Sequence, residues 1–86
     1  MAGTLFEVFV IKVVDPDDGS VRYVQDFNSE NGLGHVSFIG IKDFAKGYLR
    51  LSKAEEALDI VKTLAPKYKY SIDYYMDEFD IKSYED

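Results

Sequence analysis

Apolar and polar positions repeat with two different periods along the chain, and this predicts several strands and one helix. Residues 5–14, LFEVFVIKVV, are β-branched and aromatic on both faces, which is typical of a strand covered on both sides. Residues 21–27 and 67–75 alternate more strictly, as half-buried strands do. Residues 35–39, HVSFI, are a candidate for a further short strand.

Simple alternation assigns the side chains of residues 21–27 to two faces. It places Val21, Tyr23 and Phe27 on one face, and Val24 on the other face with charged neighbours. Residues 21–27 are therefore expected to form a half-buried strand with these two faces.

The first two predicted strands are separated by DPDDGS, which predicts an antiparallel hairpin. Asp15 can accept a backbone hydrogen bond, Pro16 favours the second position of a turn, and Gly19 can take the left-handed conformation. A calcium-binding helix–loop–helix would need glycine at its sixth position and flanking helices. Counting from Asp15, glycine comes fifth and strands flank the loop. We interpret the segment as a turn with an acidic, solvated tip.

Residues 52–55, SKAE, match a capping box, and an apolar stripe follows at three- and four-residue spacing up to Pro66. The stripe consists of Ala54, Ala57, Leu58, Val61, Leu64 and Ala65. Residues 28–34 are a loop by composition, and residues 41–47 suit either a helical turn or a loop. Residues 48–51 suit a short strand or an extended lead-in to the helix.

These elements predict an α+β fold in a single domain, residues 1–86. We expect an antiparallel sheet of three to five strands, with one amphipathic helix at residues 53–65 packed on one face. The tyrosine-rich face of residues 67–75 is expected to pack partly under this helix.

The formal net charge of −6 is spread unevenly, and it disfavours direct binding to nucleic acid or to anionic membrane. Residues 1–41 carry six acids and two bases, residues 42–69 seven bases and four acids, and residues 70–86 six acids and one base. A basic middle between two acidic ends predicts charge pairing within the chain or between subunits.

Catalytic equipment is sparse in this sequence. The chain has one histidine, His35, and no cysteine. No nucleophile motif such as G-x-S-x-G accompanies the histidine. We therefore expect no enzyme, no cofactor and no metal site. The first residues lack the pattern of a secretory signal, so we expect a cytoplasmic protein, in the host cytoplasm if a phage encodes it.

The acidic, tyrosine-rich C-terminal part is the best candidate for a partner-binding surface, because tyrosine is enriched in protein interfaces. The alternative is a packed tyrosine face followed by a solvated acidic tail. A more specific hypothesis is DNA mimicry, in which a row of carboxylates stands in for phosphates on a basic, nucleic-acid-binding partner. The candidate residues are Asp73, Tyr75, Asp77, Glu78, Phe79 and Asp80, with Asp17 and Asp18 at the hairpin tip as secondary candidates.

Residues 44–58, FAKGYLRLSKAEEAL, resemble a segment of many small uncharacterised bacteriophage proteins, in which K-A-x-R-F-S-x-E-E-A leads a strand into a capped helix. The matching residues are Lys46, Tyr48, Arg50, Ser52, Glu55, Glu56 and Ala57. Gly47 and residues 39–43 depart from the pattern. The resemblance implies an early, host-takeover protein that binds and inhibits a host protein.

Two functions follow as hypotheses. The first is a non-catalytic acidic binding protein that inhibits or modulates a protein partner by occupying its surface. The second is a self-associating structural protein that forms a homodimer through its sheet edges, with residues 5–14 and exposed rings contributing.

Overall fold

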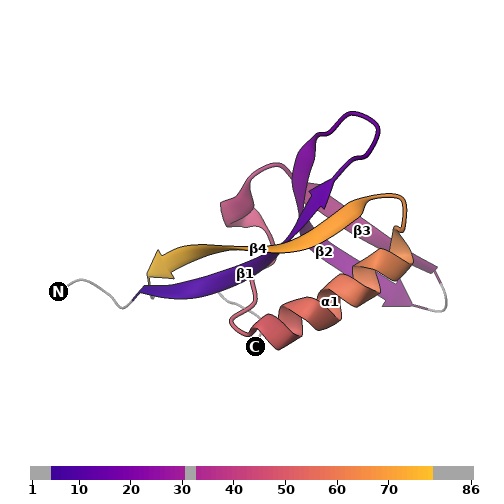
Figure 1. Ribbon diagram of the computed structural model, residues 1–86. Coiled ribbons are helices and arrows are strands. Elements are labelled where there is room, and N and C mark those ends of the chain that lie inside the picture. Colours follow the sequence, from indigo (N-terminus) through magenta and orange to yellow (C-terminus); the bar gives the residue numbers. More distant parts are fainter. Residues whose placement is uncertain (1–4, 31–32, 79–86) are drawn as a thin grey trace.

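The computed structural model describes residues 5–30 and 33–78 of the chain (Figure 1). In this part the fold is α+β, with one four-stranded antiparallel sheet and one α-helix, as predicted. The elements are β1 (Leu5–Val14), β2 (Val21–Glu30), β3 (Leu33–Ile39), the short 3₁₀ helix η1 (Lys42–Phe44), α1 (Leu51–Leu64) and β4 (Lys69–Glu78).

The strand order in the sheet is β3-β2-β1-β4, so β1 lies inside the sheet and β4 forms one edge. β1 pairs with β4 along its whole length, from Leu5 opposite Glu78 to Val14 opposite Lys69. The prediction of a strand covered on both sides is confirmed for β1, because Val8 and Val10 on one face and Ile11 and Val13 on the other are all buried.

The main core lies between α1 and one face of the sheet. The helix contributes buried Ala54, Ala57 and Val61, which belong to the predicted stripe. Their small side chains let α1 approach the sheet closely, against Ile11 and Val13 of β1. Tyr68, Tyr70 and Ile72 pack against the same cluster, so one tyrosine face does lie under the helix.

The face assignment made for residues 21–27 is wrong, because β2 contains a bulge between Val24 and Asp26. Val24 pairs with Phe38 and Asp26 pairs with Ser37, so one additional residue of β2, Gln25, interrupts the alternation. Because of the bulge, Val24 and Phe27 both face the core under the helix, although simple alternation placed them on different faces.

β1 and β2 diverge after three paired residues, and the chain between η1 and α1 enters the gap between them. β1 and β2 pair only from Lys12 opposite Tyr23 to Val14 opposite Val21. Further along, the Lys46 N–H donates to the Val24 carbonyl. Tyr48 exchanges both backbone hydrogen bonds with Phe9, at 2.8 Å each. Residues 45–48 thus fill the space between the strands, and the extended lead-in predicted at 48–51 is reduced to one bridge.

Several predicted boundaries differ from the structure, and β4 runs from Lys69 to Glu78 rather than over residues 67–75. The loop expected at 28–34 is mostly strand, because β2 continues to Glu30 and β3 begins at Leu33. Pairing across this hairpin, with Asn28 opposite His35, outweighs the loop-like composition. Gly34 is required there by space, since a Cβ on it would lie 2.8 Å from the backbone carbonyl oxygen of Asn28 and would also meet the Leu64 side chain of α1.

The capping box predicted at Ser52 does not form. The helix begins at Leu51, with Arg50 as N-cap and no side-chain capping bond. The Arg50 carbonyl accepts the N–H groups of both Lys53 and Ala54, so the helix begins two residues earlier than predicted. The other end agrees better with the sequence, since the helix stops at Leu64, just before Pro66, and the Tyr70 hydroxyl donates to the Ala65 carbonyl.

Candidate functional site

The acidic hairpin tip is a turn, as the sequence predicted, and its carboxylates are partly used by the turn itself. The Asp15 carboxylate accepts the Asp17 N–H at 2.9 Å, and the Asp18 carboxylate accepts the Ser20 N–H at 2.8 Å. The bond from the Ser20 N–H holds the pKa of Asp18 below its usual value. Gly19 takes a φ of 75°, the left-handed conformation expected of it.

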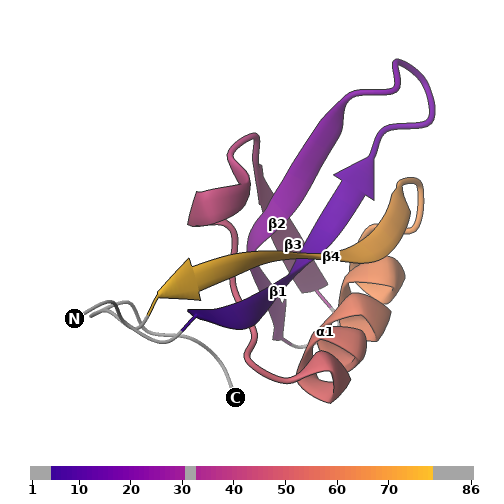
Figure 2. The same cartoon turned by 60° about the vertical axis from the view of Figure 1, so that its left-hand side comes forward.

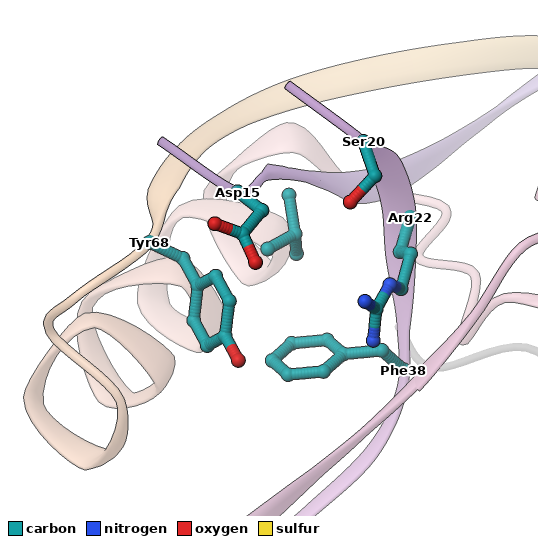
Figure 3. A pocket seen from close by; sticks show the side chains of 6 residues that line it. Asp15, Ser20, Arg22, Phe38 and Tyr68 are labelled. Carbon is teal, nitrogen blue, oxygen red and sulfur yellow. The ribbon is translucent and has the colours of Figure 1, made fainter. Parts of the chain in front are cut away.

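Beside this turn lies a small recess (Figure 3). Asp15, Ser20 and Arg22 line it from the hairpin, and the Phe38 and Tyr68 rings close it. The two rings meet edge to face, with their centroids 5.1 Å apart. The recess has no room for a water molecule. Residues 5–30 and 33–78 contain no group of three or more His, Cys, Asp or Glu residues that could hold a metal ion.

The opposite end of the sheet is a two-stranded β arm, defined here as residues 5–9 of β1 with residues 74–78 of β4. Figures 1 and 2 show this arm extending past α1. The reason is length: ten strand residues span about 33 Å, whereas a fourteen-residue helix spans about 21 Å. The helix therefore covers the part of β4 near Tyr70 and Ile72 and leaves the β arm uncovered.

Among its described side chains, the β arm carries two exposed apolar ones on its helix-side face. Tyr74 is 54% exposed and Met76 is 50% exposed. Neither residue is among the site residues predicted from the sequence. The signal that could have found them is the mismatch between strand and helix lengths, which both follow from the predicted residue ranges.

The predicted site residues Asp73, Tyr75 and Asp77 share the other face of β4, opposite Val10, Val8 and Phe6 of β1. Tyr75 is half-buried, and its hydroxyl is buried without a hydrogen-bond partner. Asp77 is half-buried as well. The side chain of Glu78, and the whole of Phe79 and Asp80, lie outside the described residues.

Asp73 has a structural role. One of its carboxylate oxygens lies 3.0 Å from the Lys42 ammonium of η1, and the other accepts the Tyr74 N–H at 2.8 Å. Partial burial raises the pKa of Asp73, but the bonds from Lys42 and Tyr74 outweigh burial and hold the pKa below its usual value. With the 3.7 Å pair between Lys46 and Asp26, this confirms the predicted pairing of the basic middle with the acidic ends.

We expect the Asp73→Asn variant to lose less stability on acidification than the wild type. A carboxylate whose pKa is lower in the folded state than its unfolded value of about 3.9 stabilises the fold above that pH, and this contribution disappears as the pH falls through the folded pKa. Because both side chains of the Asp73–Lys42 pair are about a third exposed, at 30% and 32%, solvent screening limits the effect to about 1 kcal/mol.

The measurement is urea unfolding between about pH 7 and pH 3, compared with the Asp59→Asn variant, whose carboxylate lies on the exposed outer face of α1. The assignment of Asp73 is contradicted if the Asp73→Asn variant and the wild type lose the same free energy of unfolding over this range.

The structure separates the two groups of predicted site residues. Asp17 and Asp18 follow the end of β1 at Val14, whereas Asp77 lies opposite Phe6, near the other end of β1. At about 3.3 Å per residue, the eight residues between Phe6 and Val14 place the two groups roughly 26 Å apart. The hairpin tip and the β arm therefore do not form one continuous acidic surface.

A shallow groove of about 230 Å³ runs between α1 and the residues that fill the strand gap. Phe27, Tyr48 and Ile60 contribute its apolar lining, and Lys46 and Lys53 lie at its rim. Each lysine lies 3.7 Å from a carboxylate, of Asp26 and Glu56 respectively. The groove therefore has no surplus of positive charge with which to select an anion.

His35, the one histidine of the chain, is exposed on β3 and pairs with Asn28 across the hairpin, away from the β arm. In the described part of the chain, no helix is long and apolar enough to cross a membrane. Comparison with protein-family models, curated proteins and solved structures finds no match to this chain.

Proposed function

We propose that the protein is a non-catalytic binding protein that occupies the surface of a protein partner with its β arm. The observation that carries the proposal is the exposure of Tyr74 and Met76 on a part of the sheet that α1 does not cover. Two paired strands are only marginally stable by themselves in water, so an arm of this kind is stabilised by a surface that covers it. Tyrosine and methionine are both enriched in protein interfaces.

The acidic charge of the chain favours a basic partner. The chain carries a net charge of −6, and six of its acids lie within residues 70–86. Opposite charge speeds encounter and discriminates between partners more than it adds affinity. A basic, nucleic-acid-binding protein fits this chemistry, and the resemblance to bacteriophage proteins directs the search to bacterial hosts.

Two modes of partner binding can be compared. DNA mimicry by a regular row of carboxylates along β4 has less support than a contact that combines apolar and acidic side chains. Asp73 would belong to such a row, but its carboxylate is held by Lys42 and by the Tyr74 N–H. We therefore expect the Asp73→Asn variant to change partner binding and its dependence on salt only slightly.

The test is capture from bacterial lysate with the wild type and two variants, followed by titration of the captured protein. We expect the double variant Tyr74→Ser/Met76→Ser to bind at least about tenfold more weakly, because exposed apolar residues at interface centres supply most binding energy. Val21→Ser is the matched control, since Val21 is also exposed but lies at the hairpin end of the sheet. A partner that binds both variants equally well would overturn the β arm as the contact surface.

A further inference from the structure

The outer edge of β4 presents a regular row of backbone groups. Phe9 of β1 directs its N–H and its carbonyl to Tyr48, so neither group faces Tyr74, its partner in β4. In an antiparallel ladder this makes Phe9 and Tyr74 a non-hydrogen-bonded pair, and the N–H and carbonyl of Tyr74 face away from β1. The same holds at every second residue, which adds Tyr70, Ile72 and Met76.

β4 has few of the features that usually prevent an edge strand from pairing with another chain. Its register with β1 is continuous over all ten pairs, so it has no bulge, and its residues include no proline. Its one lysine is Lys69, at the first position. The described obstacle to pairing is the hydrogen bond from the Tyr74 N–H to the Asp73 carboxylate. An edge of this length and regularity is suited to receive another strand.

The sequence of β4 is compatible with pairing to itself around a two-fold axis. In the paired edges, a residue whose N–H and carbonyl point away from β1 must lie opposite a residue of the same kind in the second copy. Because these are alternate residues, the two-fold axis passes through a residue rather than between two residues. An axis at Asp73 would set two carboxylates directly opposite each other, and this is destabilising. An axis at Tyr74 avoids that contact while keeping residues 70–78 of both strands paired.

We propose that two copies of the chain pair antiparallel through the outer edges of β4, with Tyr74 of one copy opposite Tyr74 of the other. Ile72 then faces Met76 of the second copy, so each exposed apolar side chain of the β arm gains an apolar neighbour across the axis. Ser71 faces Asp77, and Asp73 faces Tyr75, so no like charges meet among these pairs. Each Tyr74 N–H exchanges the Asp73 carboxylate for a carbonyl of the second copy.

The self-pairing is independent of the proposed partner, and it is tested on the purified protein alone. Sedimentation equilibrium should show a concentration-dependent rise in mass from 9.8 kDa to twice that value. We expect Tyr74→Pro to abolish the rise, because it removes an N–H that does not bond to β1. A wild-type mass that stays at 9.8 kDa up to about 1 mM would overturn the proposal.

A second variant tests the same interface in case the Tyr74→Pro variant does not fold. Met76→Lys places a charge on the edge, and we expect a dissociation constant about tenfold weaker, because the pair with Ile72 is lost twice in the dimer. Val21→Lys is the control, since Val21 is exposed at the far end of the sheet. Equal dimerisation of both lysine variants would overturn the β4 edge as the interface.

The register can be tested directly because the chain contains no cysteine. Two thiols placed opposite each other at strand-pair spacing can form a disulfide when diamide accepts their two electrons and two protons. We expect Tyr74→Cys to give a covalent dimer, and Asp73→Cys and Tyr75→Cys to give far less. Faster linkage at position 73, or equal linkage at all three, would overturn the Tyr74 axis.

Discussion

Replacing Ile11 by alanine is expected to lower the free energy of unfolding by about 2–5 kcal/mol, the range for truncating a large buried aliphatic side chain. Ile11 is 1% exposed and lies in the core cluster with Val13, Val61 and Tyr48. The loss combines the transfer of the removed atoms with the cavity left between the sheet and α1. For a domain of this size the melting temperature should fall by roughly 10 °C or more.

The measurement is urea and thermal unfolding followed by circular dichroism. Ile60→Ala is the matched control, because it removes the same atoms from a side chain that is 41% exposed on α1. We expect Ile60→Ala to change the free energy of unfolding by no more than about 0.5 kcal/mol. Similar losses in the two variants would show that α1 does not cover β1 in the way described.

Replacing Tyr48 by alanine is expected to cost about 3–5 kcal/mol, as for other large buried rings. Tyr48 is buried, and its backbone joins β1 through Phe9 where β2 has already diverged. The ring anchors the segment that fills this gap. Its removal should therefore loosen residues 45–48 as well as leave a cavity.

Hydrogen exchange separates the two effects. The Phe9 N–H donates to the Tyr48 carbonyl, whereas Val13 pairs within the strands on both sides. We expect the Phe9 amide to lose more protection than Val13 in Tyr48→Ala, because local opening adds to global destabilisation. Leu49→Ala, at an exposed neighbouring position, is the control. Unchanged relative protection at Phe9 would contradict the role of Tyr48 as the anchor.

Most of the strands and the helix were predictable because each pattern reports a local requirement. β1 is apolar on both faces because both faces are buried, and α1 carries Ala54, Ala57 and Val61 at helical spacing because one side of it meets the sheet. Alternation also placed Asp73, Tyr75 and Asp77 on one face of β4. The lengths of strand and helix indicated only that one end of β4 would be uncovered, not which end.

The bulge in β2, the insertion of residues 45–48 and the role of Asp73 were not predictable, because each depends on segments far apart in the chain. Val24 and Phe27 reach the same core only because β3 fixes the register across Gln25. The Asp73 carboxylate pairs with Lys42 only because the fold brings the Lys42 side chain of η1 within reach of β4.

The amino-acid sequence by itself determined the fold class, the buried faces of β1 and α1 and the acidic balance, since periodicity and composition follow from burial along one element. The tertiary structure decided which carboxylates are paired, where β1 and β2 separate, and which end of β4 remains uncovered. These features depend on long-range pairing and on the relative lengths of packed elements, for which no local pattern is required.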